Sequence, residues 1–90
     1  MPYPNEPKYA LQDGDLEKIE NVFTYHAPFG DQTERYELLR GHARELAGRI
    51  MENTPKSREQ SLALTNLEQA IFWANAAIAR NEGQQGNISG

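Results

Sequence analysis

The sequence predicts an all-α protein, with a short N-terminal helix followed by a long antiparallel helical hairpin that assembles as a homo-oligomer. Two long segments, 31–53 and 57–81, repeat apolar residues at spacings of three and four, and a short connection separates them. The later segment also carries a second apolar face. A chain of 90 residues without cysteine has little core and no disulfide, so association between copies is the remaining source of stability.

The segment from 57 to 81 is the longest helical pattern in the chain. Ser57 and Gln60 have the spacing of a capping box, and Pro55 just upstream ends any earlier helix. One apolar stripe follows the 3.6-residue period and predicts a seam against a partner helix. The stripe consists of Leu64, Leu67, Ile71, Ala74 and Ile78.

A second apolar face of this helix points away from that seam, with Trp73 nearly opposite Ile71. Its members are Leu62, Ala63, Ala70, Trp73 and Ala77. One interpretation is that Trp73 is simply half exposed, which is common for a single apolar surface residue. We favour self-association, because small alanines beside an aromatic ring let another backbone come close.

The first long helix is predicted to begin at Asp31, because Asp31 and Glu34 have capping-box spacing. Its apolar stripe comprises Tyr36, Leu39, Ala43, Leu46 and Ile50. Residues 53–56 end the helix, and so short a connection forces the two long helices to run antiparallel. Gly41 and Gly48 inside this helix are interpreted as places where a neighbouring chain comes close.

The chain divides into a proline-rich arm at 1–14, expected to be extended or disordered, a helical-hairpin ligand-binding domain at 15–82 and a disordered tail at 83–90. Asp15 is predicted to cap a short helix over 16–23. The following segment, FTYHAPFGDQ, contains Phe23, Tyr25 and Phe29, and its Pro28 and Gly30 break regular structure. A segment so rich in aromatic rings either packs down or binds a ligand.

Charge and composition exclude several classes of function. The net charge is −4, and residues 31–80 balance acids and bases, so the chain lacks the basic stripe that long nucleic acids require. No apolar run has the length of a membrane span, and the polar N-terminus does not resemble a signal peptide. A cytoplasmic protein is the expectation.

Recognised catalytic motifs are missing from the sequence. Glycine-rich phosphate loops, nucleophile elbows and metal-ligand spacings are absent, which predicts a binding protein with no cofactor and no catalysis. His26 near Asp31 is the one candidate for acid–base work, but a single loop histidine is more often structural. Four arginines on the helix from Asp31, including Arg40, suit a phosphate-bearing ligand, or else they pair with glutamates such as Glu37 on a solvated face.

Two runs, FTYHAPFGDQ and WANAAIARN, resemble anti-CBASS protein two, a family of small phage proteins that defeat cyclic-oligonucleotide immunity. The family shares its hairpin domain with a Thoeris-inhibiting sponge. The resemblance covers roughly residues 23–81. It implies a cytoplasmic homohexamer, a trimer of dimers, that sequesters cyclic dinucleotides such as cyclic GMP-AMP intact and holds cyclic trinucleotides at a separate site.

The resemblance also implies roles for particular residues. Tyr25 corresponds to the base-stacking tyrosine, with Phe23 and His26 beside it, and Arg40 falls where the family usually has a phosphate-pairing lysine. An arginine there keeps the charge but changes reach and hydrogen-bond geometry. For the trinucleotide site the candidates are Arg80 and His42.

Two other classes of function are alternatives. The second apolar face equally suits an oligomeric structural or adaptor protein that has no nucleotide ligand. A phosphodiesterase for the same messengers is the weakest reading, because neither metal ligands nor a paired acid and base are present.

Overall fold

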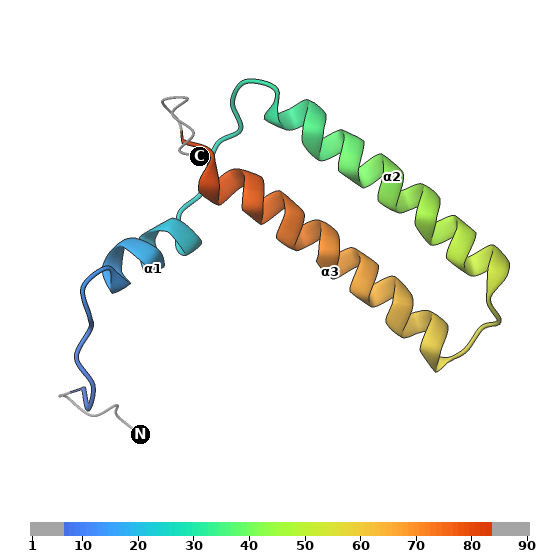
Figure 1. Cartoon of the computed structure of the whole chain (residues 1–90), viewed down its shortest axis with the longest axis horizontal. Coiled ribbons are helices and arrows are strands. Elements are labelled where there is room, and N and C mark those ends of the chain that lie inside the picture. The colour runs from blue at the N-terminus through green and yellow to red at the C-terminus, as the bar shows by residue number, and fades with distance from the viewer. Residues whose placement is uncertain (1–6, 84–90) are drawn as a thin grey trace.

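Two long antiparallel helices, α2 (Gln32–Asn53) and α3 (Arg58–Asn81), lie side by side and account for most of the chain (Figure 1). A shorter helix, α1 (Asp15–Phe23), precedes them and lies apart from α2, near the end of α3. The structure is a computed structural model that describes residues 7–83. Within that range the chain is entirely helical apart from its connections, so the predicted hairpin is confirmed.

The hairpin turn forms as the sequence predicts. Ser57 is the N-cap of α3, and its hydroxyl accepts a hydrogen bond from the Gln60 amide at 3.1 Å. The second half of the capping box is different, because the Gln60 side chain donates to Thr54 rather than reaching back to Ser57. Thr54 ends α2 in an extended conformation, which is the conformation that a residue before proline prefers.

The other two predicted caps are wrong. Asp31 occupies the N-cap position of α2 but makes no side-chain cap bond, because its carboxylate instead accepts from Arg35 Nε at 3.0 Å. The N-cap of α1 is Gly14, whose φ of 89° favours glycine. Asp15 is therefore the first helical residue, where its charge suits the positive end of the helix dipole.

The seam between α2 and α3 is narrow and only half-buried. On α3 the predicted stripe faces the partner helix as expected, and all five residues are half-buried. On α2 one member is wrong: Leu46 is 49% exposed, and Ala47 takes its place at the seam. The reason is geometric, because Leu46 lies at one edge of the predicted stripe and a single partner helix covers only its centre.

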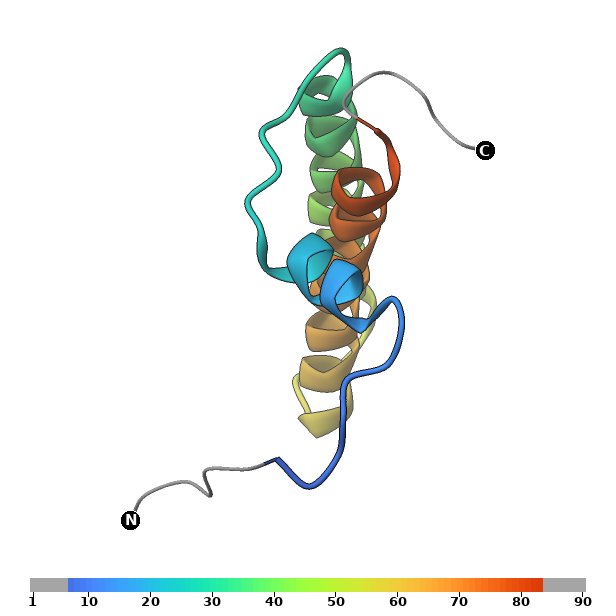
Figure 2. The same ribbon diagram turned by 90° about the vertical axis from the view of Figure 1, so that its left-hand side faces the viewer.

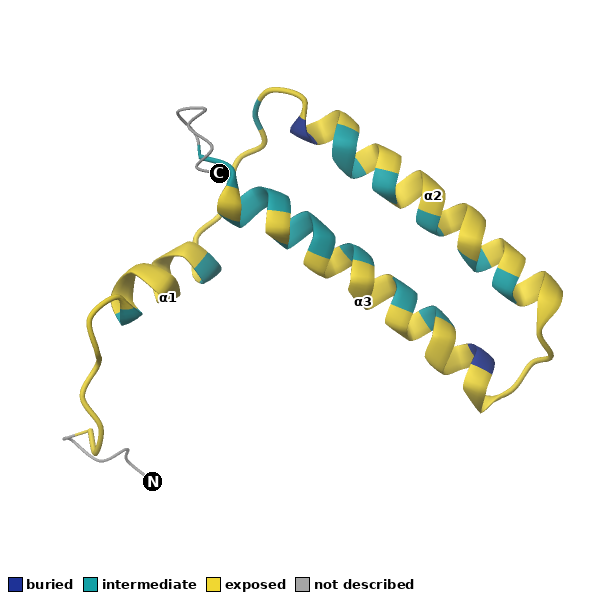
Figure 3. Ribbon diagram, viewed as in Figure 1, coloured by how far each residue is buried: buried dark blue, intermediate teal, exposed yellow. Residues whose placement is uncertain are grey.

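No apolar side chain is buried anywhere in residues 7–83, as the near absence of dark blue in Figure 3 shows. The radius of gyration is 18.7 Å, whereas a compact chain of this length would have about 12 Å. The predicted second face of α3 is bare, with Trp73 65% exposed and Phe72 beside it 61% exposed. Gly41 and Gly48 also face open space in the single chain.

The segment from 24 to 31 arches from the end of α1 to the start of α2, as the side view shows (Figure 2). This arch brings the aromatic segment to the end of the hairpin that is opposite the 54–57 turn. We call that end the open end and the turn the tip. Residues 7–14 contain no helix, and the remaining parts of the predicted arm and tail, 1–6 and 84–90, lie outside the described residues.

Candidate functional site

A pocket of about 440 Å³ lies at the open end of the hairpin. We call it the open-end pocket. Its walls come from three segments: the end of α1 with the arch, the first turns of α2, and the last turns of α3. Four of the six residues that the sequence singled out line it together, namely Tyr25, His26, Arg40 and Arg80.

Tyr25 and His26 bring an aromatic surface and a fixed imidazole to the pocket. The Tyr25 ring is 82% exposed, so it is available to stack on a ligand rather than held in a core. His26 Nε2 lies 2.7 Å from the Asn21 carbonyl oxygen. Because a carbonyl can only accept, Nε2 must carry the hydrogen, and a neutral ring then leaves Nδ1 as an acceptor.

Arg40 and Arg80 supply the positive charge. Arg40 Nη1 donates to Glu37 Oε2 at 2.7 Å, so the ion pair that the sequence offered as the alternative reading does form. The Arg40 side chain is still 47% exposed, and an exposed pair of this kind contributes at most about 1 kcal/mol. The Arg80 guanidinium carbon lies 6.0 Å from the centre of the Trp73 ring, within reach of a cation–π contact.

Phe23 and His42 are not brought to this pocket. Phe23 ends α1 with its side chain 81% exposed, although its neighbours Val22 and Thr24 both line the pocket. His42 is exposed on α2 and is not among the lining residues.

Three lining residues with polar side chains, Thr24, Tyr36 and Asn75, were missed by sequence reasoning. Tyr36 was assigned to the helix seam, and Asn75 was given no role, yet both line the open-end pocket. Asn75 Oδ1 is covered and has no hydrogen-bond partner among residues 7–83, which is uncommon for a covered polar atom. The signal was present in the sequence, because Asn75 follows Ile71 by four residues along the same stripe of α3.

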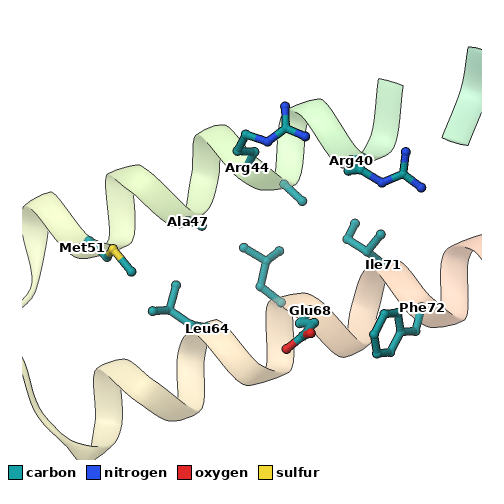
Figure 4. A pocket seen from close by; sticks show the side chains of 10 residues that line it. Arg40, Arg44, Ala47, Met51, Leu64, Glu68, Ile71 and Phe72 are labelled. Atoms are coloured by element: carbon teal, nitrogen blue, oxygen red, sulfur yellow. The ribbon is translucent and has the colours of Figure 1, made fainter. Parts of the chain in front are cut away.

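A second hollow, of about 410 Å³, lies between α2 and α3 along one side of the hairpin (Figure 4). We call it the interhelix groove. Apolar side chains such as Met51, Leu64 and Phe72 line it, and Arg40 and Arg44 stand on its α2 side. Arg40 therefore borders both hollows.

The least exposed ion pair within residues 7–83 joins α2 to the residue after α3. Arg35 pairs with Glu82 at 2.7 Å, with the two side chains 36% and 26% exposed. Hydrogen bonds from Arg35, and then from Gln32, lower the pKa of Glu82 from 4.5 to about 2. The same bonds, with Asp31 adding to them, raise the pKa of Arg35 above its usual value.

The chain matches the model of the family described as "Acb2/Tad1, hairpin domain" over residues 15–79. It belongs to that family. The match begins at the first residue of α1, contains all of α2 and ends within the last turn of α3. The resemblance to anti-CBASS protein two that the sequence indicated is thereby confirmed. No curated protein and no solved structure gives a match.

The Acb2/Tad1 match covers every residue that lines the open-end pocket except Arg80, which lies one position beyond its end. The pocket is therefore built from the family's hairpin domain and not from the proline-rich arm. Among residues 7–83, no helix is both long and apolar enough to cross a membrane.

Proposed function

We propose that this protein is a phage sponge that binds cyclic dinucleotides such as cyclic GMP-AMP and withholds them, uncleaved, from the effectors of bacterial immunity. Membership of the Acb2/Tad1 hairpin family supports the sponge class. The open-end pocket is the observation that supports this class of ligand, because the exposed ring of Tyr25 and the guanidinium of Arg40 line the same hollow. A cyclic dinucleotide offers a base face for the first and a phosphate for the second.

The protein is proposed to act as a homohexamer, a trimer of dimers, in the host cytoplasm. The lack of any buried apolar side chain in residues 7–83 supports association, because a single hairpin leaves Trp73 and its neighbours in water. In a two-fold assembly each pocket residue serves a ligand twice. Cyclic trinucleotides are proposed as further ligands through Arg80 and His42, of which only Arg80 lines the open-end pocket.

Calorimetric titration with a panel of cyclic di- and trinucleotides tests the proposal. Loss of one base–aromatic stack costs about 1–3 kcal/mol, and a ligand held twice loses up to roughly double that. Tyr25→Ala should therefore weaken cyclic GMP-AMP binding strongly. Tyr9→Ala is the matched control, because Tyr9 is 83% exposed and is not part of the pocket. Equal affinities in the two folded variants would remove Tyr25 from the site.

The proposal that the ligand survives binding has its own test. We propose no residue in the role of a water-activating base, so heat-denatured complex should release unchanged messenger. Chromatography of the released material measures this directly. Linear dinucleotide or mononucleotides in the supernatant would place the protein among the phosphodiesterases.

An adaptor function without a nucleotide ligand is the second candidate, and the interhelix groove is the observation that favours it. Its lining is mostly apolar, which suits a protein helix better than a phosphate. Ultraviolet absorbance of protein purified from cells that make cyclic dinucleotides discriminates the two. A sponge carries nucleotide absorbance through gel filtration, and an adaptor does not.

A further inference from the structure

The most buried residue among 7–83 is polar: Gln32, in the first turn of α2, is 3% exposed. Its Oε1 accepts a hydrogen bond from the Phe29 amide at 3.1 Å, and its Nε2 donates to Glu82 Oε1 at 3.0 Å. A buried amide with both ends bonded is held in one orientation. Gln32 thus joins the arch, the start of α2 and the end of α3.

Arg35 completes this connection one turn later. Nη1 and Nη2 donate to the two oxygens of Glu82 at 2.8 and 2.7 Å, in the two-pronged geometry that only arginine provides. Nε donates to Asp31 Oδ1 at 3.0 Å, which fixes the guanidinium plane. We call Gln32, Arg35 and Glu82 the open-end clamp.

The clamp residues do not line the open-end pocket, but they bond to or lie next in sequence to the arch, α2 and α3 segments that do. Tyr36 and Arg40 follow Arg35 along α2, Arg80 lies two residues before Glu82, and Phe29 closes the arch that carries Tyr25. Within residues 7–83, every side-chain hydrogen bond between residues far apart in sequence ends at Arg80 or Glu82. The fourth such bond is Asn21 Nδ2 to the Arg80 carbonyl, at 3.3 Å.

The apolar seam does not make these bonds redundant. It holds α2 against α3, but the arch from 24 to 31 contributes no buried side chain, so packing alone does not fix where Tyr25 sits. Holding a ligand-contacting segment in its bound position before the ligand arrives removes an ordering cost from binding. Hydrogen bonds at its two ends serve that purpose: His26 bonds to the Asn21 carbonyl at the start of the arch, and the Phe29 amide bonds to Gln32 near its end.

We propose that Gln32, Arg35 and Glu82 are positioning residues of the ligand site, which hold the open-end pocket in its binding form without contacting the ligand. This inference rests on the proposed nucleotide function. It predicts that loosening the clamp lowers ligand affinity by more than its effect on folding explains.

The tip of the hairpin supplies a matched control. Gln60 is the other buried residue of the described range 7–83, at 8% exposed, and its Nε2 donates to the Thr54 carbonyl and hydroxyl at 3.0 Å each. Gln32→Met and Gln60→Met each replace a buried side-chain amide with an apolar side chain of similar length. Both should lower the melting temperature. Only Gln32→Met should weaken cyclic GMP-AMP binding, by roughly tenfold or more, the effect of losing one or two good hydrogen bonds.

A measurement without ligand tests whether the clamp holds the arch, independently of whether the protein binds a nucleotide. Amide hydrogen exchange at Phe29, followed by nuclear magnetic resonance, should accelerate in Gln32→Met and stay parental in Gln60→Met. If the parent protein binds no cyclic nucleotide, the proposed function fails, while Phe29 exchange still reports whether the clamp holds the arch. Parental exchange at Phe29 in Gln32→Met would overturn the clamp.

Glu82→Gln is the second variant, and it keeps the shape of the side chain while removing its charge. It should weaken binding less than Gln32→Met, because an amide oxygen still accepts from Gln32. Equal affinities in folded Gln32→Met and Gln60→Met, or parental affinity in Glu82→Gln, would overturn the positioning role. A smaller species in gel filtration of Glu82→Gln would do so too, because it would make the clamp an assembly contact.

Discussion

The two ends of the hairpin are each held by a buried glutamine, but by different chemistry. At the tip, Gln60 bonds to Thr54, six residues away, and all partners are neutral. At the open end, Gln32 bonds to Glu82, fifty residues away, and the Arg35 ion pair reinforces that bond. The tip uses local and neutral bonds, whereas the open end uses distant and charged ones.

Chain connectivity explains the difference. At the tip a short connection already holds α2 and α3 together, so closing the turn costs little entropy. At the open end no direct chain connection joins α2 to α3, so only contacts between side chains oppose separation of the helices. Two-pronged, charge-assisted hydrogen bonds are the stronger kind, and they lie at the end that also carries the pocket.

The largest expected effect is loss of the oligomer when a charge is placed on the second apolar face of α3. Two positions along that face show which part of it other copies cover. Trp73→Arg places a charge in the proposed subunit contact toward the open end and should leave a smaller species in light scattering. Leu62→Arg places the same charge on that face near the tip. Loss of assembly in both variants would extend the contact along the whole helix. An intact oligomer in Trp73→Arg, or a monomeric parent, would contradict the prediction.

Ligand affinity should next distinguish two arginines of α2. Arg40 at the open end pairs with Glu37, and Arg49 toward the tip pairs more loosely with Glu45, at 3.7 Å. Arg40→Ala should cost about 1.5–3 kcal/mol of cyclic GMP-AMP binding and flatten its salt dependence, because a charged contact to phosphate is lost. Titration at two salt concentrations measures both. Arg49→Ala should bind as the parent does, and equal losses would mean that only overall charge matters.

A smaller effect is expected from the cap at the tip. Ser57→Ala removes the acceptor for the Gln60 amide and should lower the free energy of unfolding by about 1 kcal/mol. Denaturant unfolding at fixed protein concentration measures this loss. Ser61→Ala, one turn further along α3, is the control and should not destabilise the protein. Ligand affinity should stay parental in both, since the tip lies far from the pocket.

The pH dependence is the smallest effect near neutrality. The folded pKa of Glu82 is lowered to about 2 from 4.5, so the carboxylate stays ionised in the folded chain while the unfolded chain takes up a proton first. The stabilisation is complete above about pH 4.5 and is lost as the pH falls toward 2. Unfolding of the parent and of Glu82→Gln across this range tests it, because the variant should lack this part of the slope. A parallel slope in both would assign the dependence to other carboxylates.

The helices themselves were predictable from the sequence because their signals are local. Apolar spacing located α2 and α3, and Ser57 marked the start of the longer one. The errors were local too. Asp31 had the right position for a cap, but a competing partner, Arg35, took its carboxylate. Leu46 fitted the apolar stripe of α2, but Ala47 takes its position at the seam. The reason is that one partner helix covers a narrower strip of α2 than the spacing pattern suggests.

The candidate site was predictable only in part. The sequence assigned Tyr25 and Arg40 to one site and Arg80 to a separate one, whereas all three line the same pocket, and it gave Asn75 no role. The sequence predicts Glu82 as the last residue before the tail, and its spacing pattern does not indicate a link to Gln32 and Arg35. Such contacts join residues nearly fifty positions apart, and periodicity carries no information about them.

The sequence by itself determined the helical class, the hairpin, the short turn and the family, because each follows from spacing or from a contiguous motif. Only the tertiary structure decided which side chains meet at the open end and that the two buried residues within 7–83 are glutamines. The physical reason is that helix formation depends on neighbours in the chain. A pocket and its clamp depend on how two helices are aligned along each other, which is fixed only when they pack.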